Sequence, residues 1–502
     1  MSAPVGTAPH LDVAARRAML APDRPALHWR GDWLSYGQLN ARAERLAGRL
    51  QALGLKPGDR VSILAHNHLA HVDLILQTAK TGIVYAPLNT RLAPAEQRAI
   101  AAYLRPSLLL HDADHAEGAA ATDVPRVALE DYDAWLGDPP PAVAAALDPE
   151  DPQMILLTGG TTGLPKGAVQ SFRQGLANAA NTALSWGLRD DDLCIQATPC
   201  FHAAVNAMTV PLLHAGARVA LMERFDPGAY LALAEEVGAT LLFLVPTMFQ
   251  MVADHPSFET ADLSTVRWAI SGGAPCPDPV RAAFADRGVR FKQGYGLTEA
   301  GVNCFAIDLD DADLHPDAVG VPILRTDARV CRPDGSVCAD GEVGELTLTG
   351  PHLFSGYFER PDATAEALRD GWLWTGDLAT RDAEGRFRIV GRRKEMFISG
   401  GENVYPAEIE AALHDHPGVA SCAVLGVPDA RWGEVGLMAV VARPGIELNG
   451  EALRGWLRER LARYKIPKHA WIVDRLPTSG AGKILKTELR RRFLEERGTE
   501  PA

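Results

Sequence analysis

A glycine-rich loop at residues 159–167, GGTTGLPKG, contains four glycines, two threonines, a proline and a lysine. Glycine lets backbone N–H groups approach an anion closely, and Thr161, Thr162 and Lys166 add hydroxyl donors and a positive charge. The loop is not a Walker motif, because neither Lys166 nor Lys483 has the flanking residues of G-x-x-x-x-G-K-[ST]. The composition indicates a polyphosphate site built on a different architecture.

Four further stretches offer other groups that nucleotide chemistry needs. The first has an aromatic ring, a hydroxyl and a carboxylate within five residues, and the second has an aspartate after a glycine. The third is rich in charge and glycine, and the fourth has a lysine in a glycine-rich loop. In chain order they are QGYGLTEAG (293–301), GWLWTGDLA (371–379), GRRKEMFISGGENVYPAEIE (391–410) and LPTSGAGKILK (476–486).

Together with the loop, these stretches resemble in order and spacing the motifs of the adenylate-forming superfamily. This superfamily includes acyl-CoA synthetases, aryl-CoA ligases, firefly luciferase and peptide-synthetase adenylation domains. The resemblance spans nearly the whole chain. It implies a ligase that activates a carboxylic acid as acyl-AMP, releases pyrophosphate and passes the acyl group to CoA, with ATP, Mg²⁺ and coenzyme A as cofactors.

Carried over residue by residue, the resemblance implies a nucleotide site. Tyr295, followed by Gly296, would stack on the adenine, because a flat ring on a flat heterocycle needs no base-edge readout. Asp377 would accept from the ribose hydroxyls, and Arg392 would contact ribose or phosphate. The phosphate loop and the segment along the adenine comprise Thr158, Gly159, Gly160, Thr161, Thr162 and Lys166, and Ser271, Gly272, Gly273, Ala274 and Pro275.

The resemblance also implies the catalytic residues. Thr298 would reach the α-phosphate and Glu299 the magnesium, since a hard cation prefers a carboxylate. Lys483 would bridge the attacking carboxylate and the α-phosphate, where negative charge meets negative charge. His202 would lie next to the reacting carboxylate, and Lys394 would be the hinge on which a small domain pivots between the two half-reactions.

The stretch TPCFHAAVN (198–206) resembles the segment that lines the acyl pocket. It lacks the aspartate with which peptide-synthetase domains pair the substrate's ammonium, so an amino acid is disfavoured. The small residues Ala203, Ala204 and Ala207 leave volume for an acyl group, and an apolar cleft suits a fatty or aryl acid. The other pocket positions are Phe201, Thr247, Met248, Phe249, Gly301, Val302 and Asn303. Asn303 either satisfies a buried backbone group or contacts a polar substituent such as a phenol.

Several functions share these motifs. The main interpretation is a ligase for medium- or long-chain fatty acids, and the alternative is an aryl-acid ligase of the cinnamate, ferulate or benzoate type. A luciferase-like oxygenase and a non-catalytic acyl-adenylate sensor belong to other classes, and the presence of Lys483 and Glu299 favours an enzyme.

Coenzyme A is the acyl acceptor that the resemblance implies. Arg224 occupies the place of a CoA-contacting cation, and Gly400 and Gly401 would let a pantetheine arm pass close to the backbone. Ile398 and Gly400 stand where plant aryl-CoA ligases carry two lysines, so this chain departs from their pattern there.

Composition limits the partners. The net charge of −13 argues against a nucleic-acid binder, because no broad basic field remains for phosphate backbones. The seven scattered cysteines form no C-x-x-C pair and fit buried thiols in a reducing compartment. The chain shows no secretory signal, and its longest apolar run, LLFLV, is too short to span a bilayer. These features predict a cytoplasmic protein with small-molecule substrates; the sequence leaves open whether it forms a homodimer.

The elements that must position these residues alternate between helix and strand. Helices of 10 to 15 residues between continuous apolar strands predict parallel sheets covered on both faces. Short alternating strands between about 320 and 391 predict a small antiparallel unit. The predicted fold is therefore α/β: an N-terminal domain at 1–391 with parallel-rich sheets and a barrel-like β unit at 321–391, then a smaller mobile α+β domain at 392–502.

Overall fold

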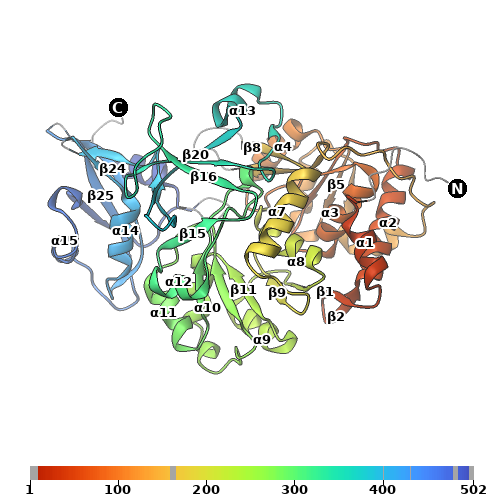
Figure 1. Ribbon diagram of the computed structural model, residues 1–502, viewed down its shortest axis with the longest axis horizontal. Helices are drawn as coiled ribbons and strands as arrows, with labels where there is room; N and C mark the ends of the chain where they lie inside the picture. The colour runs from red at the N-terminus through yellow and green to blue at the C-terminus, as the bar shows by residue number, and fades with distance from the viewer. Residues whose placement is uncertain (1–9, 159–164, 400, 430, 479–483, 497–502) are drawn as a thin grey trace. The chain divides into compact units, whose positions relative to one another are not determined.

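The computed structural model describes residues 10–158, 165–399, 401–429, 431–478 and 484–496 (Figure 1). It divides into two compact units. The first comprises residues 1–275, 284–328 and 348–373, and the second comprises residues 276–283, 329–347 and 374–502. The domain boundary at Arg392 and the hinge at Lys394 stay predictions.

The first unit contains two seven-stranded sheets. One has six parallel strands and an antiparallel edge strand, β2, in the order β13 (Phe291–Gln293), β12 (Trp268–Ser271), β11 (Leu241–Leu244), β9 (Leu193–Gln196), β10 (Arg218–Leu221), β1 (Pro25–Trp29) and β2 (Asp32–Ser35). In the other, β8 and β18 run antiparallel to their neighbours, in the order β18 (Gly356–Tyr357), β8 (Lys166–Ser171), β7 (Pro152–Thr158), β4 (Val84–Tyr85), β3 (Arg60–Leu64), β5 (Leu108–His111) and β6 (Arg126–Ala128).

Helices connect these strands, and α2 packs against both α1 and α3 while α7 packs on α8 (Figure 1). The helices of this unit are α1 (Val13–Leu20), α2 (Tyr36–Ala52), α3 (Leu69–Thr81), α4 (Pro94–Leu104), α5 (Ala116–Ala120), α6 (Tyr132–Leu136), α7 (Phe172–Ser185), α8 (Val210–Ala215), α9 (Pro227–Val237), α10 (Pro246–Ala253), α12 (Leu309–Leu314) and α13 (Pro361–Ala367). Short 3₁₀ or π turns are η1 (Ala113–His115), η2 (Leu129–Asp131), η3 (Val205–Thr209), η4 (Pro256–Glu259) and η5 (Thr298–Ala300), and β14 (Phe305–Ala306) pairs with β15 (Ala318–Pro322).

Local sequence signals explain several helix ends. Ser35 and Gln38 form a reciprocal capping box at the start of α2, and Ser171 caps α7. Gly82 ends α3 in the left-handed conformation that a residue without Cβ adopts at little cost. The predicted α/β alternation is confirmed, with parallel strands buried beneath the helices.

The second unit contains an antiparallel sheet and a C-terminal α+β module, as the change of texture after residue 320 predicted. The sheet follows the order β16 (Asp327–Cys331), β17 (Gly344–Thr349), β20 (Trp372–Arg381) and β21 (Phe387–Arg392). The short strand β19 (Leu368–Arg369) belongs to the first unit and pairs with the first two residues of β20. The module contains β22 (Phe397–Ser399), β23 (Glu402–Val404), β24 (Val419–Asp429), β25 (Gly433–Ala442), β26 (His469–Ile472), α14 (Pro406–His414), α15 (Gly450–Arg458), η6 (Arg463–Lys465) and α16 (Lys486–Glu496); α11 (Asp278–Asp286) begins within the unit.

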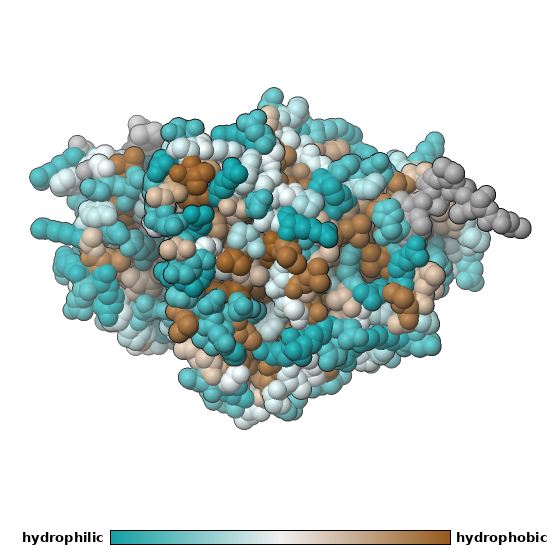
Figure 2. Space-filling view, viewed as in Figure 1, coloured by the Kyte–Doolittle hydropathy of each residue, from teal (hydrophilic) through white to brown (hydrophobic). Residues whose placement is uncertain are grey.

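The surface composition and the state of the cysteines are those of an ordinary globular protein. Figure 2 shows hydrophobic residues interspersed among hydrophilic ones on the face that it displays. Among the described residues, the helices are too short or too polar to cross a membrane. All seven cysteines are buried thiols that form no disulfide, as the sequence predicted.

Candidate active site

The two ends of the phosphate loop lie side by side. Thr158 ends β7 and Lys166 begins β8, and the two residues face each other in the antiparallel pair. The Thr158 hydroxyl donates to the Lys166 carbonyl at 3.3 Å. Gly159, Gly160, Thr161 and Thr162 lie outside the described residues. The hairpin therefore fixes where the loop leaves and re-enters the sheet.

Tyr357 connects two of the predicted site residues, although it was not itself predicted from the sequence. The Lys166 ammonium lies 4.7 Å from the centroid of the Tyr357 ring, within cation–π range. The Tyr357 hydroxyl donates to Glu299 Oε1 at 2.8 Å. Tyr357 reaches this position because β18 pairs with β8, so that Tyr357 faces Ala168. No local pattern around Tyr357 marks this pairing.

The loop from Tyr295 to Asn303 folds tightly back on itself. A Cβ on Gly296 would lie 1.3 Å from the Val302 carbonyl oxygen, so only glycine fits there. Gly301 and Val302 have φ of 74° and 121°, in the region that L-residues with side chains rarely adopt. This fold places Thr298 and Glu299 on the short turn η5, and it makes the glycines of QGYGLTEAG a steric requirement.

The segments expected along the adenine leave neighbouring strands. Ser271 ends β12 and Gln293 ends β13, and these residues face each other in a parallel pair. The Gly294 N–H donates to the Ser271 carbonyl at 2.7 Å where the chains diverge. Gly273, Ala274 and Pro275 are exposed beyond β12, whereas Tyr295 is half-buried, edge-to-face on Phe305 at 5.8 Å. Ligands of open α/β sheets bind beyond the carboxyl ends of their strands, which is where these residues lie.

The predicted acyl segment contains a π-helix, η3, which begins just after Ala203 and Ala204. Its i+5 hydrogen bonding runs from the Val210 N–H to the Val205 carbonyl. The next residue, Pro211, has no N–H, so the carbonyl of Asn206 loses the donor that would continue this pattern. π-Helical turns are rare and concentrate at functional sites, which agrees with the predicted pocket.

Two buried asparagines satisfy the carbonyls at this turn. Asn178 Nδ2 donates to the Asn206 carbonyl at 2.8 Å, and Asn303 Nδ2 donates to the Ala207 carbonyl at 2.9 Å. Asn303 Nδ2 also lies 2.9 Å from Thr182 Oγ1. These contacts support the backbone-satisfying role for Asn303 over contact with a substrate phenol.

The same network reaches the Thr298–Glu299 turn. Gln170 on β8 donates through Nε2 to the Thr298 carbonyl at 3.1 Å, and its Oε1 accepts from Asn206 Nδ2 at 2.5 Å. Gln170 and Asn206 are almost fully buried, so each bond is made where water cannot replace it. Gln170 and Asn178 were not predicted from the sequence, and Asn206 was included only as the last residue of the acyl segment, although polar residues within apolar runs are a signal that could have found them.

The other predicted pocket residues differ in exposure. Ala203 and Ala204 are partly exposed, whereas Ala207 is buried in the hydrophobic core, so Ala207 lines that core rather than open volume. Phe201 is buried, with its ring 4.5 Å from the half-buried His202. The remaining pocket positions are the buried Phe249 and Gly301, the half-buried Met248 and Val302, and the exposed Thr247.

In the second unit, the predicted ribose residues pair with each other. Asp377 on β20 faces Arg392 on β21, and Arg392 Nε lies 2.8 Å from Asp377 Oδ1. Asp377 is buried, whereas Arg392 is exposed. Because the two form an ion pair, the positive charge of the arginine offsets part of the free-energy cost of removing the carboxylate from water. Arg393 pairs with Glu345 at 3.0 Å, and Lys394 lies in the exposed turn that follows.

Lys483 lies outside the described residues, but the base of its loop is described. Thr478 and Ile484 form an antiparallel bridge, which brings the two ends of the loop together. Lys486 pairs with Glu395 at 2.6 Å and with Glu410 at 2.8 Å. The base of the lysine loop is therefore tied to the residue that follows Lys394.

The predicted CoA residues occupy two separate units. Arg224 is half-exposed in the first unit and forms an ion pair with Asp114. In the second unit, Gly401 is exposed with φ of 89°, and Ile398 is also exposed. Gly400 lies outside the described residues.

Comparisons with known proteins agree with this arrangement. The AMP-binding enzyme family matches residues 14–358, and the AMP-binding enzyme C-terminal domain matches residues 408–483. The chain therefore belongs to the AMP-binding enzyme family, the adenylate-forming class to which its fold and motifs point. Within that family it is an AMP-forming acid–CoA ligase.

Individual relatives support this assignment. A feruloyl-CoA synthase from Amycolatopsis sp is 44% identical over 482 residues, covering 95% of this chain and 98% of the relative. An indoleacetate–CoA ligase from Aromatoleum aromaticum is 36% identical, covering 95% of this chain and 96% of the relative. The o-succinylbenzoate CoA synthetase of Bacillus subtilis, in complex with its acyl-adenylate, superposes with a TM-score of 0.88 at 29% identity, covering 95% and 98% of the chains. Another structure of that synthetase holds ATP and a magnesium ion.

Proposed function

We propose that the chain activates an aromatic carboxylic acid of the hydroxycinnamate class, such as ferulate, and transfers the acyl group to coenzyme A. This proposal rests mainly on the 44% sequence identity to feruloyl-CoA synthase over nearly the whole of both chains. The relatives named above act on aromatic acids, which supports the aryl-acid alternative over the fatty-acid interpretation.

In the first half-reaction, a carboxylate oxygen of the acid bonds to the α-phosphorus of ATP as the bond to the β-phosphate breaks. Pyrophosphate leaves with the electron pair of that bond. Lys483 and Thr298 reduce the repulsion between the two anions, and Thr158, Lys166 and the loop between them hold the departing phosphates. The buried hydrogen bond from Gln170 keeps the Thr298 turn in place while charge develops.

Magnesium fits the residues present. Glu299 is a half-buried carboxylate with one oxygen already oriented by the Tyr357 hydroxyl, and a carboxylate with free lone pairs suits a hard cation. Bound Mg²⁺ neutralises charge on the polyphosphate. Tyr357 keeps the carboxylate oriented, and its ring face lies against the Lys166 ammonium beside the same site.

In the second half-reaction, the CoA sulfur bonds to the acyl carbon, the bond to the AMP oxygen breaks, and AMP leaves with that electron pair. We assign Asp377 and Arg392 to the ribose and α-phosphate, Lys394 to the hinge, and Arg224, Gly400 and Gly401 to CoA. Tyr295 and Gly273, Ala274 and Pro275 hold the adenine. His202, Phe201, Ala203, Ala204, Met248 and Gly301 form the acyl wall, with Asn303 supporting it from behind.

The test is a panel of acids scored by CoA-dependent AMP release. The panel contains ferulate, cinnamate, indoleacetate, benzoate, octanoate and palmitate at matched concentrations. Ferulate or another hydroxycinnamate should have the highest kcat/KM, by at least ~10-fold over octanoate. A single misplaced methylene in an apolar pocket already changes kcat/KM by about this factor, and an aromatic acid and a straight-chain acid differ in shape by more than that. A higher kcat/KM for octanoate or palmitate would restore the fatty-acid interpretation, and AMP release without CoA acylation would remove the ligase assignment.

A further inference from the structure

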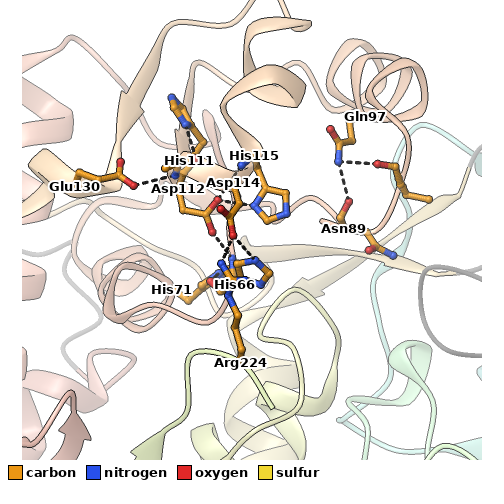
Figure 3. Close-up of polar contacts among 12 residues, drawn as sticks. His66, His71, Asn89, Gln97, His111, Asp112, Asp114, His115, Glu130 and Arg224 are labelled. Atoms are coloured by element: carbon orange, nitrogen blue, oxygen red, sulfur yellow. Dashed lines mark hydrogen bonds and ion pairs between the residues drawn. The ribbon is translucent and has the colours of Figure 1, made fainter. Parts of the chain in front are cut away.

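A cluster of imidazoles and carboxylates lies where two parallel strands end in the first unit. His66 follows β3, and Asp112 follows the neighbouring strand β5. Asp114 and His115 belong to the short turn η1 that comes next. Because β3 and β5 are parallel neighbours, their carboxyl ends meet at one edge and bring these segments together (Figure 3). The reaction proposed above does not use these four side chains.

The ligand atoms in this cluster are already close together. His66, Asp112 and His115 each offer one ligand atom, and these atoms lie within 4.8 Å of one another. The two imidazole rings have centroids 4.8 Å apart and meet edge to face. His66 Nε2 also lies 3.3 Å from Asp114 Oδ2. Figure 3 shows these side chains converging from separate segments.

Backbone bonds hold the central carboxylate in place. Asp112 Oδ2 accepts from the His66 N–H at 2.8 Å, and Oδ1 accepts from the His115 N–H at 3.1 Å and contacts His115 Nδ1 at 2.5 Å. Capping of η1 accounts for one of these bonds, but it does not account for the convergence of His66 from another strand. A carboxylate has about four acceptor sites, so these bonds leave capacity for a further partner.

We propose that His66, Asp112 and His115 form a binding site for a divalent first-row transition metal such as Zn²⁺. Two imidazoles and one carboxylate suit zinc and its neighbours, whereas magnesium and calcium prefer oxygen ligands alone.

The charge of Arg224 is expected to weaken metal binding at the proposed site. Its guanidinium pairs with Asp114, which also contacts His66, so a positive charge lies beside the site. That charge opposes a bound cation and occupies the carboxylate that could serve as a fourth ligand. Removal of the arginine should therefore strengthen metal binding, while removal of either imidazole should weaken it.

The experiment uses the full chain after treatment with a chelator. Zn²⁺ binding is measured by isothermal titration calorimetry, and Co²⁺ binding by visible absorption, because Co²⁺ reports nitrogen coordination directly. The wild type should bind one metal per chain at this site, and metal should raise its melting temperature because only the folded chain holds the site.

His66→Gln and His115→Gln should each weaken binding by at least ~10-fold, since even outer-sphere changes at metal sites cost this much. Arg224→Gln should bind at least as tightly as the wild type. His315→Gln is the matched control, because it removes an imidazole elsewhere in the first unit and should leave the affinity unchanged.

Equal Zn²⁺ affinity in the wild type and the His66→Gln/His115→Gln double variant would overturn the proposal. Circular dichroism in chelator checks that the variants fold. If they do not fold, the wild-type Co²⁺ spectrum decides: an imidazole-ligated spectrum supports the site, and the spectrum of hydrated Co²⁺ overturns it.

Discussion

In the first unit, the loop from Tyr295 to Asn303 is fixed by close packing, whereas the junction around Arg392 in the second unit is held by ion pairs at exposed side chains. Gly296 has no room for a methyl group, and the Thr298 carbonyl is bonded by the buried Gln170. Arg392 and Arg393 are both exposed, and each pairs with a buried carboxylate.

This difference matches what each half-reaction needs. Adenylation gains from groups held rigidly where charge develops, because they need not reorganise during the step. A segment that pivots must break and remake its contacts, and an ion pair whose arginine stays in contact with water can exchange partners more readily than a fully buried one. We infer that the first unit is preorganised for adenylation and that the junction is built to exchange partners.

The largest effect is expected from Lys483→Ala. Acyl-adenylate formation should slow by about 10²–10³-fold, because a positive charge aimed at the transition state is lost. Thioester formation from supplied acyl-adenylate should stay nearly unchanged. Single-turnover assays of each half-reaction measure this. Equal loss in both would assign a structural role to the lysine loop.

Gly296→Ala tests the packed side of the comparison. The added methyl would overlap the Val302 carbonyl, so the backbone must move and carry Thr298 and Glu299 with it. Adenylation should slow by ~100-fold, the cost of about 1 Å of misplacement. Gly455→Ala is the control, because its Cβ would meet nothing within 4 Å in helix α15. Unchanged adenylation by Gly296→Ala would show that the loop tolerates movement.

Lys394→Pro tests the exposed side. Proline fixes φ near −65° and restricts a pivot, so thioester formation should slow by at least ~10-fold while adenylation survives. Lys394→Ala removes the charge but keeps backbone freedom, and it should behave like the wild type. Stopped-flow measurement of each step distinguishes the outcomes. A thioester rate unaffected by proline would place the hinge elsewhere.

Gln170→Leu removes the link between the Thr298 turn and the π-helix. Two buried partners lose their bonds, so the free energy of unfolding should fall by about 1–3 kcal/mol, with a lower adenylation rate. Gln250→Leu is the control, because the Gln250 amide donates to Asp254 on an exposed helix surface, where water can replace the lost partner. Urea denaturation provides the measurement. A stability loss no larger than that of the control would mean that the network does not fix the loop.

The smallest effect concerns His352, whose carbonyl packs against Gly301 of the same loop. Burial, followed by the Arg173 charge, lowers the pKa of His352 to about 4, whereas an unfolded histidine titrates near 6.5. As pH falls from about 6.5 to 4, the unfolded chain takes up the proton first, so the native state loses stability. His352→Gln should reduce that loss, while His315→Gln should retain it. Parallel pH profiles for the wild type and His352→Gln would contradict the assignment.

The types of side chain that this protein offers for its reaction could be predicted from its sequence. Glycines, hydroxyls, lysines and carboxylates occur in an order that resembles the motifs of the adenylate-forming superfamily, and this resemblance predicted ATP-dependent acid activation. Helix ends were also readable, since the caps at Ser35, Ser171 and Gly82 are made by residues only a few positions apart. The acid was not readable in this way, and the comparisons favour an aromatic one over the fatty acid that was expected.

Only the tertiary structure decided which distant residues meet. Tyr357 reaches Glu299 because β18 joins the edge at β8, and Asn303 reaches Ala207 because a π-helix and Pro211 leave carbonyls without donors. His66 and His115 lie together because β3 and β5 are neighbours. Strand order and helix register depend on packing across the whole unit, so no local pattern in the sequence encodes these contacts.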